Sequence, residues 1–352
     1  MLFSSTDKEK YIGVDIGSQT VKVCQLIHGR KEISLKSVGL ANLPSSAIVN
    51  GVIKEPRLIA DNLQSLLSHL QIKTKEIVFA ISGYSVIIKK IILPFIPERE
   101  LAQSIEYEAQ QHIPFDIKEV NLDFQILNSV KSETDSMPVL LVAVKKETLN
   151  AYLEIFELSG LQASIADVAA FALANAYEFN YPLESTPVAL VNLGAGQITL
   201  HVINQNGPVF TRDIFLGGRQ LTEQIKSLLN ISFEEAEKIK LGKDRTPEQL
   251  DRIGPPFLSV VQTWTEEIKQ VLDVLTASDP DNKPAKIILS GGTSLMPGLP
   301  QLLSKGVQMP VELFNPFSQV RIDPEIFDQA YLQSLGPQLA IAFGLALRQK
   351  GK

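Results

Sequence analysis

The sequence has little cysteine, no excess of positive charge and no long apolar run, and each shortage excludes a class of protein. Cys24 is the only cysteine among 352 residues, so an internal disulfide and a cysteine-cluster metal site are excluded. The formal net charge is −6, so the chain lacks the excess of basic residues that is typical of nucleic-acid-binding proteins. The longest apolar runs, 138–144 and 340–347, are too short to cross a bilayer.

Residues 1–10 also lack the apolar stretch of a signal peptide. We therefore expect a cytoplasmic protein that binds no nucleic acid and reaches a membrane only through a partner. Its 45% hydrophobic and 20% charged residues are ordinary for a folded protein. The length allows two domains or one large two-lobed α/β domain.

What the sequence does contain is a strand, a polar tip and a returning strand over residues 11–26, which predicts a β-hairpin. Gly17 can adopt a positive φ and lets backbone N–H groups approach a ligand closely. Asp15 would repel a bare phosphate, but a hydrated Mg²⁺ between them makes the carboxylate favourable. The residues expected to grip phosphate are Gly17, Ser18, Gln19 and Thr20.

Two alternatives remain open for this hairpin. An Asp-x-Gly hairpin is also an ordinary β-turn, in which Asp15 would only cap the turn. Lys22 lies on the returning strand, where it could reach a phosphate or be a solvated surface lysine. The hairpin alone therefore does not establish a nucleotide site.

Residues 189–200 repeat the layout of the hairpin about half the chain length later. Asn192 takes the place of Asp15, and the second tip consists of Gly194, Ala195, Gly196 and Gln197. A duplicated lobe with a ligand between the halves is the economical explanation of this repeat.

Several helices and strands follow from apolar periodicity. Amphipathic helices are predicted over 57–71 and 257–276, the second with Trp264 in the core. Residues 84–145 predict a strand, a helix and two strands, with a polar turn at 131–136. The apolar run at 86–93 is expected either in a core or lining a groove for a partner peptide.

The two hairpins resemble the phosphate-binding hairpins of the actin, Hsp70 and sugar-kinase superfamily. Residues 289–299 resemble its adenosine motif, and the alanine-rich helices at 168–177 and 339–347 resemble its two connecting helices. This resemblance implies nucleoside contacts by Gly291, Gly292, Thr293 and Met296, the last at the base. Gly217 and Gly218, with Glu237 and Lys240, are similar to segments near the ribose and base, although Glu237 and Lys240 could instead form a surface pair.

The implied fold is α/β, a duplicated actin-like (RNase H-like) bilobed fold. The first lobe is expected over 9–185 and 335–350, with an inserted subdomain at about 84–146. The second lobe is expected over 186–334, with a smaller subdomain at about 219–282.

Within the superfamily, residues 107–115 and 165–168 resemble the PilM family, the cytoplasmic actin-like proteins of type IV pilus assembly. The segment 348–352 lacks the membrane-binding helix of the related FtsA proteins. The resemblance implies ATP and Mg²⁺ in the cleft and a scaffold at the inner face of the inner membrane. It also implies binding of the N-terminal cytoplasmic peptide of a PilN-like inner-membrane protein, with other pilus motor or platform proteins as further candidates.

The expected chemistry is nucleotide binding with at most slow ATP hydrolysis. Asn192 stands where the family usually has aspartate, and an amide cannot act as a base. The acid that positions the attacking water would be Asp167, or would be missing if the register places Ala169 there. Asp15, acting on the metal through water, and Asp167 are the candidate catalytic residues. The alternatives are a polymer-forming FtsA-like cell-division or cytoskeletal ATPase and an actin-superfamily ATPase or kinase with real turnover.

Overall fold

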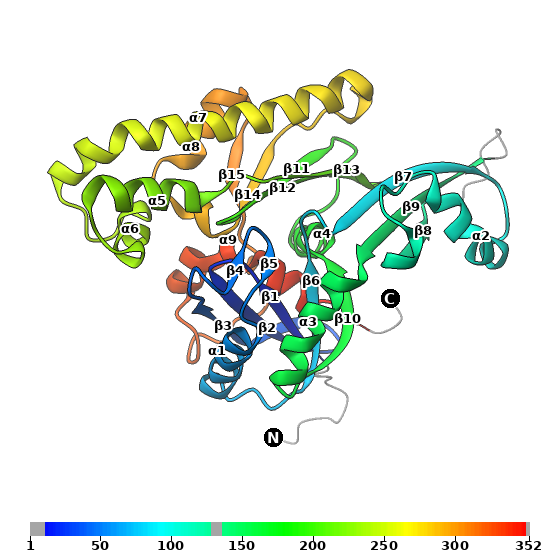
Figure 1. Ribbon diagram of the computed structural model, residues 1–352, viewed down its shortest axis with the longest axis horizontal. Coiled ribbons are helices and arrows are strands. Elements are labelled where there is room, and N and C mark those ends of the chain that lie inside the picture. Colours follow the sequence, from blue (N-terminus) through cyan, green and yellow to red (C-terminus); the bar gives the residue numbers. More distant parts are fainter. Residues whose placement is uncertain (1–10, 128–135, 350–352) are drawn as a thin grey trace.

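The computed structural model describes residues 11–127 and 136–349 (Figure 1). Three of the expectations above fall outside these ranges: the segment 1–10, most of the turn at 131–136, and the lobe ends placed at 9 and 350. Within the described ranges, no helix is both long enough and apolar enough to span a membrane.

A five-stranded sheet forms the core of the N-terminal half, in the order β10-β6-β1-β2-β3. The first three strands form an antiparallel meander, and β6 and β10 add to β1 in parallel. Its strands are β1 (Ile12–Ile16), β2 (Thr20–His28), β3 (Ile33–Asn42), β6 (Glu76–Ile81) and β10 (Gln162–Val168). One face packs on α1 (Pro56–His69) and α3 (Lys146–Leu158), and β4 (Ile48–Val49) and β5 (Val52–Ile53) form a small hairpin beside it.

A second five-stranded sheet has the same connectivity, in the order β13-β12-β11-β14-β15. Its meander is antiparallel, and β14 and β15 extend β11 in parallel. Its strands are β11 (Val188–Leu193), β12 (Ile198–Asn204), β13 (Gly207–Ile214), β14 (Ile287–Ser290) and β15 (Val311–Leu313). The duplication expected from the two hairpins is therefore confirmed in the sheets.

The helices of the second half cover one face of this sheet (Figure 1). They are α5 (Gly218–Leu229), α6 (Phe233–Lys240), α7 (Pro247–Ser278) and α8 (Leu299–Val307), with short 3₁₀ turns η2 (Pro280–Asn282) and η3 (Gly292–Leu295). Trp264 is fully buried, as predicted. The predicted start of α7 at 257 is wrong, because a capping box at Thr246 starts the helix earlier and Pro255 and Pro256 lie inside it.

Two helices lie between the sheets and join the halves: α4 (Ala169–Asn180) and α9 (Gln329–Ala346). They cross closely, since a Cβ on Gly344 would collide with the carbonyl oxygen of Ala172. Their core also contains Leu26 from the first sheet and Leu190 from the second. The two lobes therefore share one apolar core built around these helices.

A separate three-stranded sheet, β7-β9-β8, projects beyond the two large sheets (Figure 1). Its elements are β7 (Val86–Pro94), α2 (Glu98–Gln110), η1 (Ile117–Glu119), β8 (Val120–Ile126) and β9 (Ser136–Lys145), in the predicted order. We call it the inserted unit. The apolar run at 86–93 divides between its two faces, because Ile91 and Leu93 are buried under α2 whereas Ile92 is 73% exposed.

Candidate functional site

The two hairpin tips have the same backbone turn. The N–H of Gly17 donates to the Thr20 carbonyl at 2.9 Å, and the N–H of Gly194 donates to the Gln197 carbonyl at 2.9 Å. Some tip N–H groups make no hydrogen bond within the described residues, namely those of Ser18, Gln19, Ala195 and Gly196. Each tip therefore presents free donors to a ligand, as an anion-binding turn does.

The two tips approach each other across the lobes. A Cβ on Gly196 would lie 3.3 Å from the hydroxyl oxygen of Ser18. Arg219, the second residue of α5, donates from Nη2 to the Ser18 carbonyl at 3.1 Å. Arg219 was not predicted from the sequence, although its place directly after Gly217 and Gly218 was a signal.

The base of the first hairpin carries an ion pair. Asp15 lies opposite Lys22 in the register, and Lys22 Nζ is 2.9 Å from Asp15 Oδ2. The two side chains are only 13% and 11% exposed. The alternative of a solvated Lys22 is therefore wrong. A Cβ on Gly17 would lie 2.9 Å from Nζ, so the ammonium group is directly beside the turn.

The base of the second hairpin is neutral. Asn192 lies opposite Thr199, and Asn192 Oδ1 accepts a hydrogen bond from the Ser290 hydroxyl at 3.4 Å. Thr199 in turn donates to Asp213 Oδ1 at 2.6 Å. Burial raises the pKa of the Asp213 carboxyl, against the hydrogen bonds from Thr199 and from the N–H of Gly83. Asp213 was also missed, because β13 brings it to the hairpin from outside the repeat.

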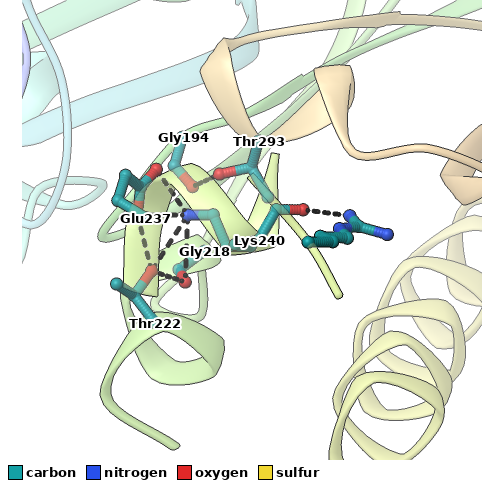
Figure 2. A network of polar contacts seen from close by, with 7 residues as sticks. Gly194, Gly218, Thr222, Glu237, Lys240 and Thr293 are labelled. Atoms are coloured by element: carbon teal, nitrogen blue, oxygen red, sulfur yellow. Dashed lines mark hydrogen bonds and ion pairs between the residues drawn. The ribbon is translucent and has the colours of Figure 1, made fainter. Parts of the chain in front are cut away.

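A buried lysine organises the polar network beside the second hairpin (Figure 2). Lys240 Nζ lies 2.7 Å from Glu237 and 3.0 Å from the Thr222 hydroxyl, and it donates to the Gly218 carbonyl at 3.3 Å. Burial lowers the pKa of the Lys240 ammonium group, and the Glu237 carboxylate opposes that shift. The alternative of a surface pair is wrong, because the Lys240 side chain is fully buried.

The glycines predicted at the site lie where side chains would collide with the second hairpin or with this network. A Cβ on Gly217 would lie 2.6 Å from the Ala195 carbonyl, and one on Gly218 would collide with the Thr293 hydroxyl. Thr293 donates to the Gly194 carbonyl at 2.9 Å. Gly291 has φ +91°, and a Cβ there would collide with the backbone of Leu193. The structure thus joins the second tip, the start of α5 and the turn at 291–293, with Gly292 beside them at the start of η3.

Two predicted site residues lie elsewhere. Met296 is 1% exposed in the core of the second lobe, because the residue ends η3 with its side chain directed inward, so contact with a base is excluded in this conformation. Asp167 is also buried; its Oδ2 pairs with Arg348 at 2.7 Å, and its Oδ1 accepts the N–H of Val168 at 2.8 Å. No contact among the described residues ties Asp167 to either hairpin.

The donors at the tips fit a phosphorylated ligand better than a metal bound by protein alone. Within the described ranges, no group of three or more histidine, cysteine or acidic side chains is placed to hold a metal. Lys22 occupies Oδ2 of Asp15, which leaves Oδ1 for a metal-bound water. The buried Gln19 Nε2 and Arg219 Nε have no hydrogen-bond partner within the described chain. These orphaned donors and the glycine-lined turns together suit a ligand with anionic oxygens.

A second contact between the lobes lies where the chain enters the inserted unit. The N–H of Gly83, which has φ +89°, donates to Asp213 Oδ2 at 3.0 Å. The ring of Tyr84 stacks on Phe215 with centroids 3.2 Å apart and planes at 9°. We call Gly83, Tyr84, Asp213 and Phe215 the interlobe clasp. It connects the second hairpin, through Thr199 and Asp213, to the entry of the inserted unit.

Comparisons with known proteins agree over most of the chain. Residues 13–350 match the family model described as "Type IV pilus assembly protein PilM". The solved "PilM-PilN type IV pilus biogenesis complex" is similar at 28% identity and a TM-score of 0.85, covering 96% of this chain and 98% of that one.

A more distant solved structure shares the fold, and a more distant relative matches in sequence. The ethanolamine utilization protein EutJ from Carboxydothermus hydrogenoformans has 15% identity and a TM-score of 0.58, covering 96% of this chain and 89% of that one. The cell division protein FtsA of Bacillus subtilis (strain 168) is 22% identical over 356 residues, 88% of this chain and 79% of that protein.

Proposed function

The chain belongs to the family of the type IV pilus assembly protein PilM and has a bilobed actin-like fold, and on that premise we propose that it is an ATP-binding scaffold of the pilus assembly platform. The observation that carries the nucleotide part is the pair of facing tips with matching turns and free N–H groups. The structural match to a PilM-PilN complex supports a PilN-like membrane protein as the partner. The scaffold would then lie at the inner membrane through that partner.

In this proposal the nucleotide lies between the tips. The N–H groups of both tips would hold the phosphates, and the ammonium group of Lys22, which is paired with Asp15, would lie beside the first tip. The backbone at Gly217, Gly218, Gly291 and Gly292 would approach the nucleoside. Glu237, whose carboxylate is held by Lys240, would lie near the ribose. Asp15 would hold Mg²⁺ through a water molecule, and the metal would supply charge neutralisation for the phosphates.

The proposed role is binding with at most slow hydrolysis. Asn192 offers an amide where a carboxylate would be needed to accept a proton. Asp167 is already neutralised by Arg348 and bonded to the backbone. Neither residue is therefore placed to activate a water quickly.

The interlobe clasp gives a route from the nucleotide to the partner. Asp213 contacts both Thr199 of the second hairpin and Gly83 at the entry of the inserted unit. A change in the distance between the two hairpins would therefore move Gly83, where the chain enters the inserted unit. The partner's affinity would then differ between the closed and open forms, which is the only way a ligand can shift the equilibrium.

We place partner docking on or beside the inserted unit. This unit carries large exposed apolar side chains, namely Ile92, Phe95 and Tyr107. The N-terminal tail of a membrane protein could cover these side chains, so that this chain would reach the membrane without entering the bilayer. The first lobe in this proposal comprises residues 9–185 and 335–350, and the second comprises residues 186–334.

Calorimetry of the purified chain tests this function. We expect one Mg-ATP per chain, and a peptide copying the N-terminal tail of a PilN-like partner should bind with an affinity that Mg-ATP changes at least about threefold. Tyr84→Ala is the matched control, since it should bind both ligands but lose most of that coupling. Absence of ATP binding would refute the nucleotide site, and equal peptide affinity with and without ATP would refute the coupling.

The match to FtsA favours a second candidate, an ATP-dependent polymer. Light scattering and electron microscopy of the chain with Mg-ATP distinguish the two roles. Filaments that form without any partner peptide would favour the second candidate over the scaffold.

A further inference from the structure

Arg219 is tied to the second hairpin by its backbone. Its N–H donates to the Ala195 carbonyl at 2.8 Å, and the N–H of Gly218 donates to the Gly194 carbonyl at 3.0 Å. The first turn of α5 is therefore fixed to the second tip, and the Arg219 side chain starts from a rigid position.

The Arg219 side chain reaches the opposite tip. Nη2 donates to the Ser18 carbonyl at 3.1 Å, and the Ser18 hydroxyl faces Gly196 of the second tip. The guanidinium group thus lies between the two turns whose N–H groups are free. It is anchored in one lobe and bonded to the other.

The charge of Arg219 has no carboxylate partner. The described residues offer no acidic oxygen within 4.0 Å of the guanidinium group, and its buried Nε has no hydrogen bond. Burial lowers the pKa of Arg219, while the more distant Glu223 and Glu237 act in the opposite direction. The half-buried guanidinium group has therefore lost part of its water without gaining an anion, which is unfavourable.

The other two cations described at the site are already neutralised. Lys22 pairs with Asp15 at 2.9 Å, and Lys240 pairs with Glu237 at 2.7 Å. Arg219 is therefore the cation of these three that can accept a new anion without displacing a carboxylate. Its present acceptor is a neutral carbonyl, and a phosphate oxygen forms a stronger, charge-assisted hydrogen bond.

We propose that Arg219 is the residue through which the two tips distinguish a nucleotide by its phosphate charge, exchanging the Ser18 carbonyl for a phosphate oxygen. The proposal rests on the nucleotide site proposed above. The exchange would release a direct bond between the lobes and replace it with one through the ligand. Arg219 would thereby determine the affinity for the polyphosphate.

The test compares Arg219→Gln with the wild-type chain in calorimetric titrations of Mg-ATP, adenosine and inorganic tripolyphosphate. Glutamine keeps an uncharged N–H donor and removes the charge. We expect Mg-ATP and tripolyphosphate to bind about 10- to 100-fold more weakly to the variant, with adenosine changed less than about twofold. Arg219→Lys should be intermediate, because it keeps the charge and loses the planar fork.

Arg252→Gln is the matched control. Arg252 is an exposed arginine on α7 that also donates to a backbone carbonyl, that of Leu228 at 2.6 Å, away from the tips. It should behave as wild type with all three ligands. Melting temperatures without ligand show whether each variant is folded.

The outcomes separate the two proposals. Equal losses for all three ligands, or no loss for Mg-ATP in Arg219→Gln, would overturn the role of Arg219 and leave the nucleotide site intact. Binding of tripolyphosphate but not of Mg-ATP by the wild-type chain would overturn the nucleotide site and support the anion role. Binding of neither ligand would overturn both.

Discussion

The two hairpins have the same backbone turn but differ in the charge of the side chains at their base. Each glycine turn closes with the same hydrogen bond between residues three apart. At the base, however, Asp15 faces Lys22 in the first hairpin, whereas Asn192 faces Thr199 in the second. The duplicated lobes thus keep the geometry that presents N–H groups, while only the first has a carboxylate at this position of the hairpin.

The difference extends to the next positions of the two sheets. Lys22 lies beside Leu40 on the third strand, whereas Thr199 lies beside Asp213. Two residues further along the second strand, Cys24 of the first lobe corresponds to His201 of the second. The base of the first hairpin is paired within the hairpin, Asp15 with Lys22, whereas the base of the second is connected through Thr199 and Asp213 to Gly83 at the entry of the inserted unit.

The largest effect is expected from the lysine pairs of the two lobes. Glu237→Ala leaves Lys240 charged and fully buried, so the free energy of unfolding should fall by about 3–5 kcal/mol. Asp15→Ala should cost less, because Lys22 retains some exposure. Urea denaturation measures both. Adding Lys240→Met to Glu237→Ala should recover most of the lost stability. Equal losses of unfolding free energy in Glu237→Ala and Asp15→Ala would contradict the difference between the two lobes.

Acid should destabilise the chain through the second lobe. Burial lowers the pKa of His201 to about 4, while an unfolded histidine titrates near 6.5. Between these values the unfolded chain binds a proton that the folded chain does not. The free energy of unfolding therefore falls as the pH drops from about 6.5 to about 4, by up to about 3 kcal/mol.

Two variants isolate this acid effect. His201→Gln should remove most of the difference in stability between pH 7 and pH 4, measured by urea denaturation at each pH. Burial raises the pKa of the corresponding Cys24 thiol, which is therefore neutral throughout this range. Cys24→Ala should lower the free energy of unfolding by a similar amount at every pH. If the pH dependence of that free energy changed in Cys24→Ala, the acid effect could not be assigned to His201 alone.

Asp213→Leu makes the second lobe resemble the first. The substitution removes the bonds to Thr199 and to the Gly83 N–H, which should cost about 1–3 kcal/mol of unfolding free energy. Hydrogen exchange at Gly83 and Tyr84 should become faster, while exchange in β2 and β3 should not change. Unchanged protection at Gly83 would show that the clasp does not depend on Asp213.

Asn192→Asp makes the second hairpin resemble the first and is expected to have the smallest effect. The new carboxylate could accept a proton or orient a water, so ATP turnover should rise about tenfold, equivalent to about 1.4 kcal/mol in the barrier. Steady-state phosphate release measures this turnover. Asn192→Ala is the control and should stay at the wild-type rate; equal rates in the Asp and Ala variants would remove the explanation for slow turnover.

The sequence predicted the local features well, because strand, turn and glycine signals depend on neighbouring residues. It predicted both hairpins, the order of elements in the inserted unit and the core position of Trp264. It left the burial of Lys22 and Lys240 open, since burial depends on elements that pack from elsewhere in the chain. Arg219 and Asp213 were missed because their partners, Ser18 and Gly83, lie in the other lobe.

Two errors have a different origin. The predicted start of α7 at 257 followed its apolar periodicity, yet the capping box at Thr246 starts the helix earlier and the helix continues through Pro255 and Pro256. The position of Met296 was inferred from resemblance, and η3 directs its side chain into the core. Neither outcome can be derived from residue spacing alone.

The most direct test of the account is calorimetry of Mg-ATP binding to Asp15→Asn and Asn192→Ala side by side, with and without Mg²⁺. If the first hairpin supplies the metal contact and the second only holds the phosphates, Asp15→Asn should bind more than about tenfold more weakly and lose its dependence on Mg²⁺. Asn192→Ala should stay within about threefold of wild type and keep that dependence. Equal losses in the two variants, or a Mg²⁺ dependence that survives in Asp15→Asn, would contradict the division of roles between the hairpins.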